Sequence, residues 1–400
     1  MTIKRLLAIA FIVGCTSLGW FILAHALQSR SQSTESRLSP EVAQNWGPEL
    51  MQEHPQLFYE SPTAARARRD LQPERTDIKV RLAYEPKRKG LLWHRTYFAD
   101  FEGEYLVKNP MPIPQTIFVA FRFPAKDARF DKFSLRFGEK LTDKAPSDGW
   151  IRESLLIPPG GEVPLKVTWR AAGTNSWRYG FPHSRRVKNL RLAMTTDFRE
   201  INVPSGAESP TQRELADNGW LLRWDYTDVI GANAIGMDLP SVTNPGEVAK
   251  RMTFFAPVSL LFFFAVLVIL AIAMGKNLHP MNYFFLAAGC FAFQLMFAYL
   301  VDLLPLLVSF VIAASVSLLL VNGYLWRAAG AKFAQCSAAA QTAYMVLFSY
   351  SFFFEGLTGI TITIGAVITL ALLMAFTARI NWDRAFQPGH RQPPPIPQGA

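Results

Sequence analysis

The chain has 400 residues, a formal net charge of +10 and three cysteines. Residues 28–252 contain no cysteine, which excludes a disulfide framework there, and no two cysteines have the spacing of metal ligands. The mean hydropathy is only +0.13, but long apolar runs near both ends of the chain exclude an ordinary soluble protein.

Six apolar runs predict membrane-spanning helices. A helix of about 20 apolar residues crosses the hydrocarbon core of a bilayer, where lipid offers the backbone no hydrogen-bond partner. The predicted spans are Leu6–Leu27, Thr253–Met274, Tyr283–Val301, Pro305–Leu325, Ala338–Phe354 and Leu357–Thr377. The lipid bilayer is therefore an expected partner of both groups of helices.

The basic residues between these runs predict the orientation. Short loops that carry Lys and Arg stay in the cytoplasm during insertion. The two short loops of the opposite side carry Asp302 and Glu355 and no basic residue. With a cytoplasmic N-terminus, the inner segments carry Lys4, Arg5, Lys276, Arg327, Lys332, Arg379, Arg384 and Arg391. We therefore expect both termini in the cytoplasm and the large domain outside, which in a bacterium is the periplasm.

Cys15 raises a question of processing. The residues Ile12-Val13-Gly14-Cys15 resemble a bacterial lipobox, in which the cysteine becomes a lipidated N-terminus after cleavage. The apolar core of a signal peptide is only about 7–15 residues long, whereas this run continues to Leu27. An uncleaved anchor is predicted, and lipidation stays the alternative.

The segment between the first two spans predicts an all-β domain. Residues 28–77 are polar and interrupted by prolines, which is typical of a linker with short helices. From Ile78, short runs alternate between apolar and polar residues, as in Thr116–Phe123 and Val163–Trp169. Such alternation predicts strands with one buried face, and an antiparallel β-sandwich, with an enlarged immunoglobulin-like fold as one form, fits best.

The predicted organisation is an N-terminal transmembrane helix, a linker, a sandwich domain, a bundle of five transmembrane helices and a proline-rich, disordered cytoplasmic tail. These parts cover residues 1–27, 28–77, 78–249, 250–385 and 386–400, respectively.

Aromatic residues of the sandwich have two interpretations. Ten of them could line a carbohydrate-binding face, namely Trp93, Tyr97, Phe98, Phe101, Tyr105, Trp169, Trp177, Tyr179, Trp220 and Trp224. Alternating strands, however, need large side chains between their sheets, so we expect these residues in the core.

The sequence contains no motif of an established catalytic site. It lacks Gly-x-Ser-x-Gly, His-Glu-x-x-His, a phosphate-binding glycine loop and Cys-x-x-Cys. We expect no enzymatic activity, cofactor, metal or nucleic-acid partner. A carboxylate inside a membrane often marks a proton or ion path. Because Asp302 and Glu355 lie at span boundaries, we expect interfacial loop acids.

Several short motifs resemble those of CreD-type inner-membrane proteins. His279-Pro280-Met281-Asn282-Tyr283 before an apolar run resembles the His-Pro-x-Gln-Tyr turn of that family. The end of the last run, Thr377-Ala-Arg379-Ile-Asn-Trp382, is similar to its Thr-Arg-x-x-x-Trp segment. Asp302 and Glu355 stand where the family has acidic motifs, each reduced here to one acid. The resemblance covers residues 250–383, and beyond it only the layout is similar.

The resemblance implies a bacterial inner-membrane protein that acts in cell-envelope integrity, colicin tolerance or envelope stress. A second hypothesis is a receptor whose outer domain captures a glycan or a protein and signals through the helices. A third is a proton-coupled transporter or intramembrane enzyme that uses Asp302 and Glu355. A groove of exposed aromatic residues would favour the receptor, and two acids meeting in a wet cavity would favour the third hypothesis.

Overall fold

The structure is a computed structural model, which describes residues 3–61, 67–90, 92–181, 186–242, 244–354 and 358–378. Contacts divide the chain into two compact units. The helical unit comprises Met1–Thr34 and Thr243–Ala400, and the β unit comprises Glu35–Val242. The boundary between residues 34 and 35 lies inside one continuous helix, α1 (Ile3–Trp46).

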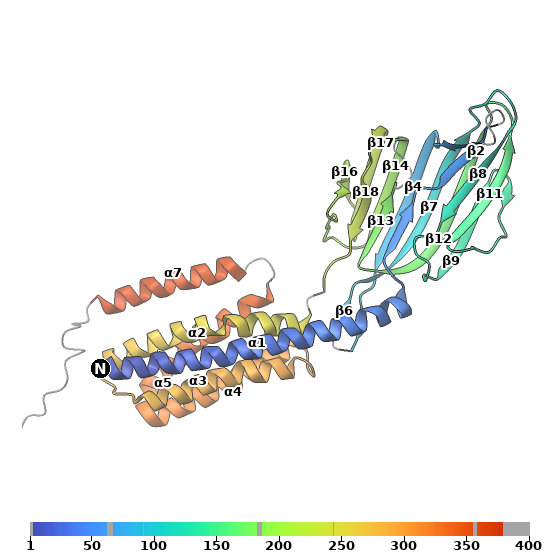
Figure 1. The fold of residues 1–400 in the computed structure, drawn as a ribbon. Coiled ribbons are helices and arrows are strands. Elements are labelled where there is room, and N and C mark those ends of the chain that lie inside the picture. Colours follow the sequence, from blue (N-terminus) through green and yellow to red (C-terminus); the bar gives the residue numbers. More distant parts are fainter. Residues whose placement is uncertain are drawn as a thin grey trace, which may run out of the picture. The chain divides into compact units, whose positions relative to one another are not determined.

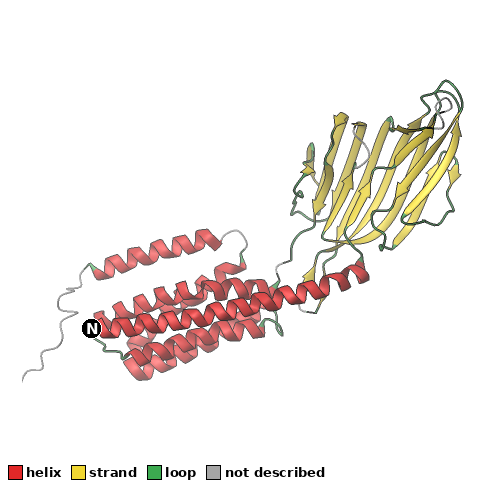
Figure 2. Ribbon diagram, in the orientation of Figure 1, coloured by secondary structure: helices red, strands yellow, loops and turns green. Residues whose placement is uncertain are grey.

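The β unit contains strands β1 to β18 (Figures 1 and 2). In chain order they are β1 (Leu50–Glu53), β2 (Gln56–Glu60), β3 (Arg68–Leu71), β4 (Arg75–Tyr84), β5 (Lys87–Lys89), β6 (Leu92–His94), β7 (Thr96–Lys108), β8 (Gln115–Arg122), β9 (Phe130–Phe137), β10 (Lys140–Leu141), β11 (Trp150–Ile157), β12 (Glu162–Thr174), β13 (Ser176–Gly180), β14 (Arg186–Thr196), β15 (Ala207–Glu208), β16 (Gln212–Leu215), β17 (Trp220–Ile230) and β18 (Ala234–Asp238).

The strands form one large sheet, two smaller ones and a hairpin. The eight-stranded sheet has the order β10-β9-β12-β7-β4-β14-β17-β16, and the four-stranded sheets have the orders β1-β13-β18-β15 and β11-β8-β2-β3. The pairs β4–β14, β1–β13 and β15–β18 are parallel. The prediction of a purely antiparallel sandwich is therefore wrong. Alternation reveals a half-buried strand, but it carries no information about the direction of the neighbouring strand.

One hydrophobic core holds these sheets together. Alternate residues of β4, namely Ile78, Val80 and Leu82, are buried, because successive side chains of a strand point to opposite faces. The core also takes residues from both four-stranded sheets, which therefore face the eight-stranded sheet as a second layer.

The tryptophans follow the core interpretation with one exception. Trp177 and Trp224 are fully buried and Trp169 is 2 % exposed, so the prediction that they fill the core is confirmed. Trp93, on the short strand β6, is 37 % exposed.

Residues 28–77, expected as a polar linker with short helices, contain the second half of α1, strands β1 to β3 and the first residues of β4. Leu38 and Val42 lie one turn apart on α1, and both are buried in the β unit. The helix ends at Trp46, and the next residue, Gly47, has a positive φ of 109° and lies against β12. A Cβ atom at this position would lie 2.1 Å from the carbonyl oxygen of Ala172. Burial of one helix face thus outweighs the weak local preferences of a polar sequence.

Four helices among the described residues are long and apolar enough to cross a membrane. They are α1, α2 (Pro245–Ala273), α3 (Pro280–Leu300) and α4 (Leu306–Ala329). The prediction of six spans is therefore wrong.

The difference lies in the last two predicted spans. The chain after Gly330 changes its helix type repeatedly, through α5 (Ala331–Gln341), the π-helix η1 (Thr342–Leu347), α6 (Phe348–Tyr350) and the 3₁₀-helix η2 (Ser351–Phe353). The last helix is α7 (Thr358–Thr377), whose apolar described stretch is Ile362–Ala371. A hydropathy pattern measures composition and is blind to such changes of hydrogen-bond register.

Candidate functional site

The predicted His-Pro motif forms the start of α3. The Nδ1 atom of His279 accepts a hydrogen bond from the backbone N–H of Met281 at 3.2 Å, and Pro280 occupies the first turn. Pro is favoured at this position because its missing N–H has no partner within the helix. Tyr283 is buried, with its ring edge-on to Phe264 of α2 at 5.4 Å between centroids. The motif is thus a helix cap joined to a packing contact.

Of the predicted acids, Asp302 takes part in an ion pair. Its carboxylate lies 2.5 Å from Nη2 of Arg30 on α1, and the two side chains are 21 % and 49 % exposed, respectively. Asp302 is therefore partly accessible and is neutralised by Arg30. A buried proton carrier would be enclosed and would have no such partner. The other predicted site residues, Glu355, Arg379 and Trp382, lie outside the described residues.

The helical unit contains a chain of hydrogen-bonded amides and hydroxyls, buried or partly buried, that the sequence did not reveal. Asn322 of α4 donates to Oε1 of Gln341 on α5 at 2.8 Å, and Gln341 donates to Oγ of Ser317 at 3.1 Å. Ser317 donates in turn to the carbonyl oxygen of Gly289 on α3 at 2.9 Å. We call Asn322, Gln341, Ser317 and Gly289 the polar seam. It joins three helices whose polar residues appear scattered in the sequence.

Close packing makes the seam possible. A Cβ atom at Gly289 would lie 2.7 Å from Cγ2 of Val321, so only glycine allows α3 and α4 to approach this closely. Hydrogen bonds between apolar helices contribute about 0.6 kcal/mol each on average. No member of the seam is ionisable, so its chemistry is that of a structural contact.

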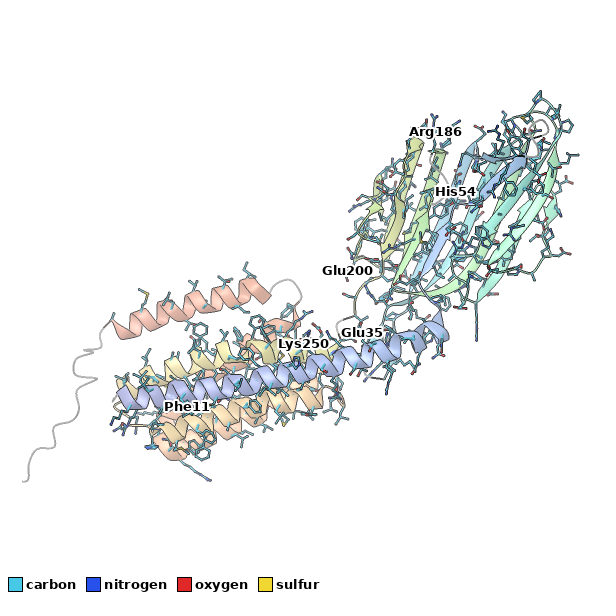
Figure 3. The ribbon with its side chains drawn as sticks, in the orientation of Figure 1. Phe11, Glu35, His54, Arg186, Glu200 and Lys250 are labelled. Carbon is cyan, nitrogen blue, oxygen red and sulfur yellow. The ribbon has the colours of Figure 1, made fainter. Side chains whose placement is uncertain are left out.

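A buried histidine lies in the core of the β unit, between β1 and β2 (Figure 3). The Nδ1 atom of His54 is 2.9 Å from the hydroxyl of Tyr179, which is 3.0 Å from the hydroxyl of Tyr105. The Nε2 atom of His54 is buried without a hydrogen-bond partner. Burial lowers the pKa of His54 to about 3, so its imidazole is neutral at pH 7. An enclosed neutral ring of this kind supports the core rather than chemistry.

The outer face of the eight-stranded sheet contains two adjoining hollows. One, of about 590 Å³, is lined by residues of β4, β14, β16 and β17. The other, of about 580 Å³, is lined by β4, β7, β12, β14 and β17, with Lys132 of β9. Lys79, Ala193 and Arg223 border both hollows, and we call the two together the sheet hollow.

Strand register explains the position of the sheet hollow. Ala193 of β14 is paired with Lys79 of the parallel strand β4 on one side and with Arg223 of the antiparallel strand β17 on the other. Side chains at paired positions point to the same face of a sheet. The methyl group of Ala193 therefore forms a low point between two long basic side chains.

Basic side chains outnumber acidic ones in the sheet hollow, and several lack a carboxylate partner. Asp77 and Asp100 are occupied by Arg75 at 2.7 Å and Arg170 at 3.6 Å, and Arg223 pairs with Glu214. Among the described residues, four lining cations have no ion pair, and these are Lys79, Arg81, Lys132 and Arg191. Two lining acids, Glu102 and Asp225, also have no ion pair among the described residues, so the four cations leave the sheet hollow with a net positive charge.

Comparison with known proteins connects the C-terminal part of the chain to a family. The model of the family described as "Inner membrane protein CreD" matches residues 205–383. The resemblance to CreD is confirmed over this segment. The matched residues include α2, α3 and α4, so the apolar helices and the CreD match together indicate a membrane protein.

The other comparisons add less. A search among curated proteins finds no match. Among solved structures, one match is a Legionella pneumophila protein provisionally named a nutrient binding protein. It is 13 % identical, with a TM-score of 0.35 over 50 % of this chain and 74 % of the other. That likeness carries no argument about fold or function.

Proposed function

We propose that this protein resides in the bacterial inner membrane, holds its β unit on the periplasmic side, and acts without catalysis in cell-envelope integrity or the envelope stress response. The observation that carries the proposal is the CreD match over residues 205–383, which includes three of the four candidate spans. The envelope role is what the resemblance to CreD-type proteins implies, and the match over residues 205–383 supports that resemblance.

The distribution of charge around the four candidate spans supports the orientation. Lys4 and Arg5 stand at the start of α1, Lys276 stands between α2 and α3, and Lys332 follows α4. The short connection between α3 and α4 contains Asp302 and no basic residue. Basic residues remain cytoplasmic in short loops, so the segment between α1 and α2, which contains all the strands of the β unit, falls outside.

Reporter fusions test this orientation. Alkaline phosphatase folds only outside the cytoplasm, so a fusion after Gly47 should be active and a fusion after Lys276 should be silent. Green fluorescent protein at the same two positions should give the opposite pattern and serves as the control. An active phosphatase after Lys276 would contradict the orientation.

The surroundings of the titratable candidates support a role without catalysis. Asp302 is ion-paired to Arg30, and His54 is enclosed by aromatic rings of the core. The corresponding experiment is deletion of the gene, followed by measurement of survival in detergent, colicin and osmotic stress. Survival should fall and should be restored by the full chain. Unchanged survival under all three stresses would contradict the envelope role.

A receptor is the second candidate function, and one observation favours it. A carbohydrate-binding face formed by Trp169, Trp177 and Trp224 is excluded, because these three side chains are buried. The sheet hollow offers a different surface, because it is lined by charged and hydroxyl-bearing side chains from several strands. Each of its halves has the volume of a typical small-molecule site, about 300–1,000 Å³. A periplasmic glycan or protein is the corresponding partner.

A further inference from the structure

We propose that the sheet hollow binds an acidic oligosaccharide, whose carboxylate or phosphate groups contact Lys79, Arg81 and Arg191. This inference rests on the second candidate function, that of a receptor, and names its ligand. The three cations have no ion pair among the described residues, and they come from two neighbouring strands, β4 and β14. Charge-assisted hydrogen bonds from Lys and Arg are the usual means of holding carboxylate and phosphate groups.

The arrangement of the three cations fits an extended ligand. Arg191 lines the first half of the sheet hollow, Arg81 lines the second, and Lys79 borders both. A ligand that lies across Ala193 would pass from one half to the other and meet the three cations in turn. Because each half alone has the size of a small-molecule site, an oligomer fits the combined space better than a single sugar.

The position within the sheet favours a saccharide over a peptide. An extended peptide gains most of its affinity by adding a strand to an exposed sheet edge. The sheet hollow lies over β4 and β14, which are interior strands paired on both sides, by β7 and β14 and by β4 and β17, respectively. The backbone N–H and C=O groups of β4 and β14 are already used in pairing with the neighbouring strands, so a ligand must be recognised by side chains.

The remaining lining groups suit hydroxyl groups. Glu102 lies directly across from Lys79, and Asp225 lies directly across from Arg191. Carboxylates accept hydrogen bonds from hydroxyl groups, and the hydroxyls of Thr168 and Thr195 both donate and accept. Cations alternating with acceptors match a chain of sugar rings that carries both hydroxyl and acidic groups.

Isothermal titration calorimetry on the full-length protein in a neutral detergent tests this proposal, with tetragalacturonic acid as the probe. We expect measurable binding at low salt that weakens as salt rises, because exposed charges are screened. The neutral maltotetraose should bind at least 10-fold more weakly, since one charge-assisted hydrogen bond accounts for a factor of roughly 10 or more.

Variants locate the binding. Lys79→Ala should weaken binding roughly 10-fold, and Ala193→Trp should abolish it by filling the low point. The matched control is Lys166→Ala, which removes an exposed lysine of β12 that pairs with Glu104 and lines neither half. It should leave binding unchanged. Melting temperatures of the three variants show that each is folded, and Lys79→Ala provides the test if Ala193→Trp is not.

Several results would overturn the proposal. Absence of tetragalacturonate binding, or equal binding of maltotetraose, would reject an acidic saccharide. Equal binding of tetraglutamate would assign the sheet hollow to an acidic peptide instead. Unchanged affinity in Lys79→Ala would place binding elsewhere. Stress survival is a separate readout: if Ala193→Trp loses binding but still restores survival, the ligand site stands and its part in the envelope role fails.

Discussion

Protonation of His54 should make the β unit sensitive to acid. Burial lowers the pKa of His54 to about 3, whereas an unfolded histidine has a pKa of about 6.5. Between these two pH values His54 is protonated in the unfolded chain and neutral in the folded chain. The free energy of unfolding therefore rises with pH in this range. The stability that depends on a neutral His54 is fully present above pH 6.5 and is lost progressively as the pH falls towards 3.

The size of the effect follows from the two pKa values. Each pH unit below about 6.5 costs about 1.4 kcal/mol, so the free energy of unfolding should fall by about 2 kcal/mol between pH 7 and pH 5. The change His54→Phe should abolish this part of the pH dependence, because phenylalanine keeps a ring of similar size and cannot be protonated. At pH 7 the variant loses the bond to Tyr179, which costs about 1 kcal/mol, while Tyr179 keeps its partner Tyr105.

The assay is urea denaturation of the full-length protein in neutral detergent, followed by tryptophan fluorescence at pH 7, 6 and 5. If His54→Phe and the native chain lost equal stability between pH 7 and pH 5, the reasoning from burial would be refuted.

Three further predictions concern stability and the ion pair of the helices. Trp169→Ala should lower the free energy of unfolding by about 3–5 kcal/mol in a denaturant titration, since the indole fills the core, and reductant should have no effect on the melting temperature of the native chain. Burial raises the pKa of Glu153, but hydrogen bonds from Lys140 and two other side chains outweigh this and lower the pKa to about 2. Glu153→Gln should therefore destabilise by about 1–3 kcal/mol at pH 7, and the difference should shrink as the pH falls from about 4.5 to 2 in the same titration. Asp302→Asn removes a partly exposed ion pair with Arg30 and should cost about 1 kcal/mol in a thermal melt, with stress survival retained. Complete loss of survival at normal protein levels would instead favour a proton path.

The sequence predicted features that depend on one residue and its near neighbours. Alternation located most strands after Ile78, and the apolar runs located α2, α3 and α4, because periodicity and composition act locally. Features that depend on pairs of distant residues were missed. The parallel pairing of β4 with β14 and the contact of Gln341 with Ser317 are examples. His54 was missed for the same reason, since no local pattern distinguishes it from an exposed histidine.

The CreD match and the sheet hollow depend on different parts of the chain. The match begins at residue 205, within the β unit, and includes β17, which in the eight-stranded sheet lies between β14 and β16. Without β14, one side of β17 would have no partner, so the start of the match is not a boundary of the fold. Lys79, Arg81 and Arg191 lie before residue 205, and only Arg223 of the described basic lining lies within the match. The family resemblance therefore supports the membrane role, whereas the proposed ligand depends on residues that the match does not include. Either proposal can be refuted without refuting the other.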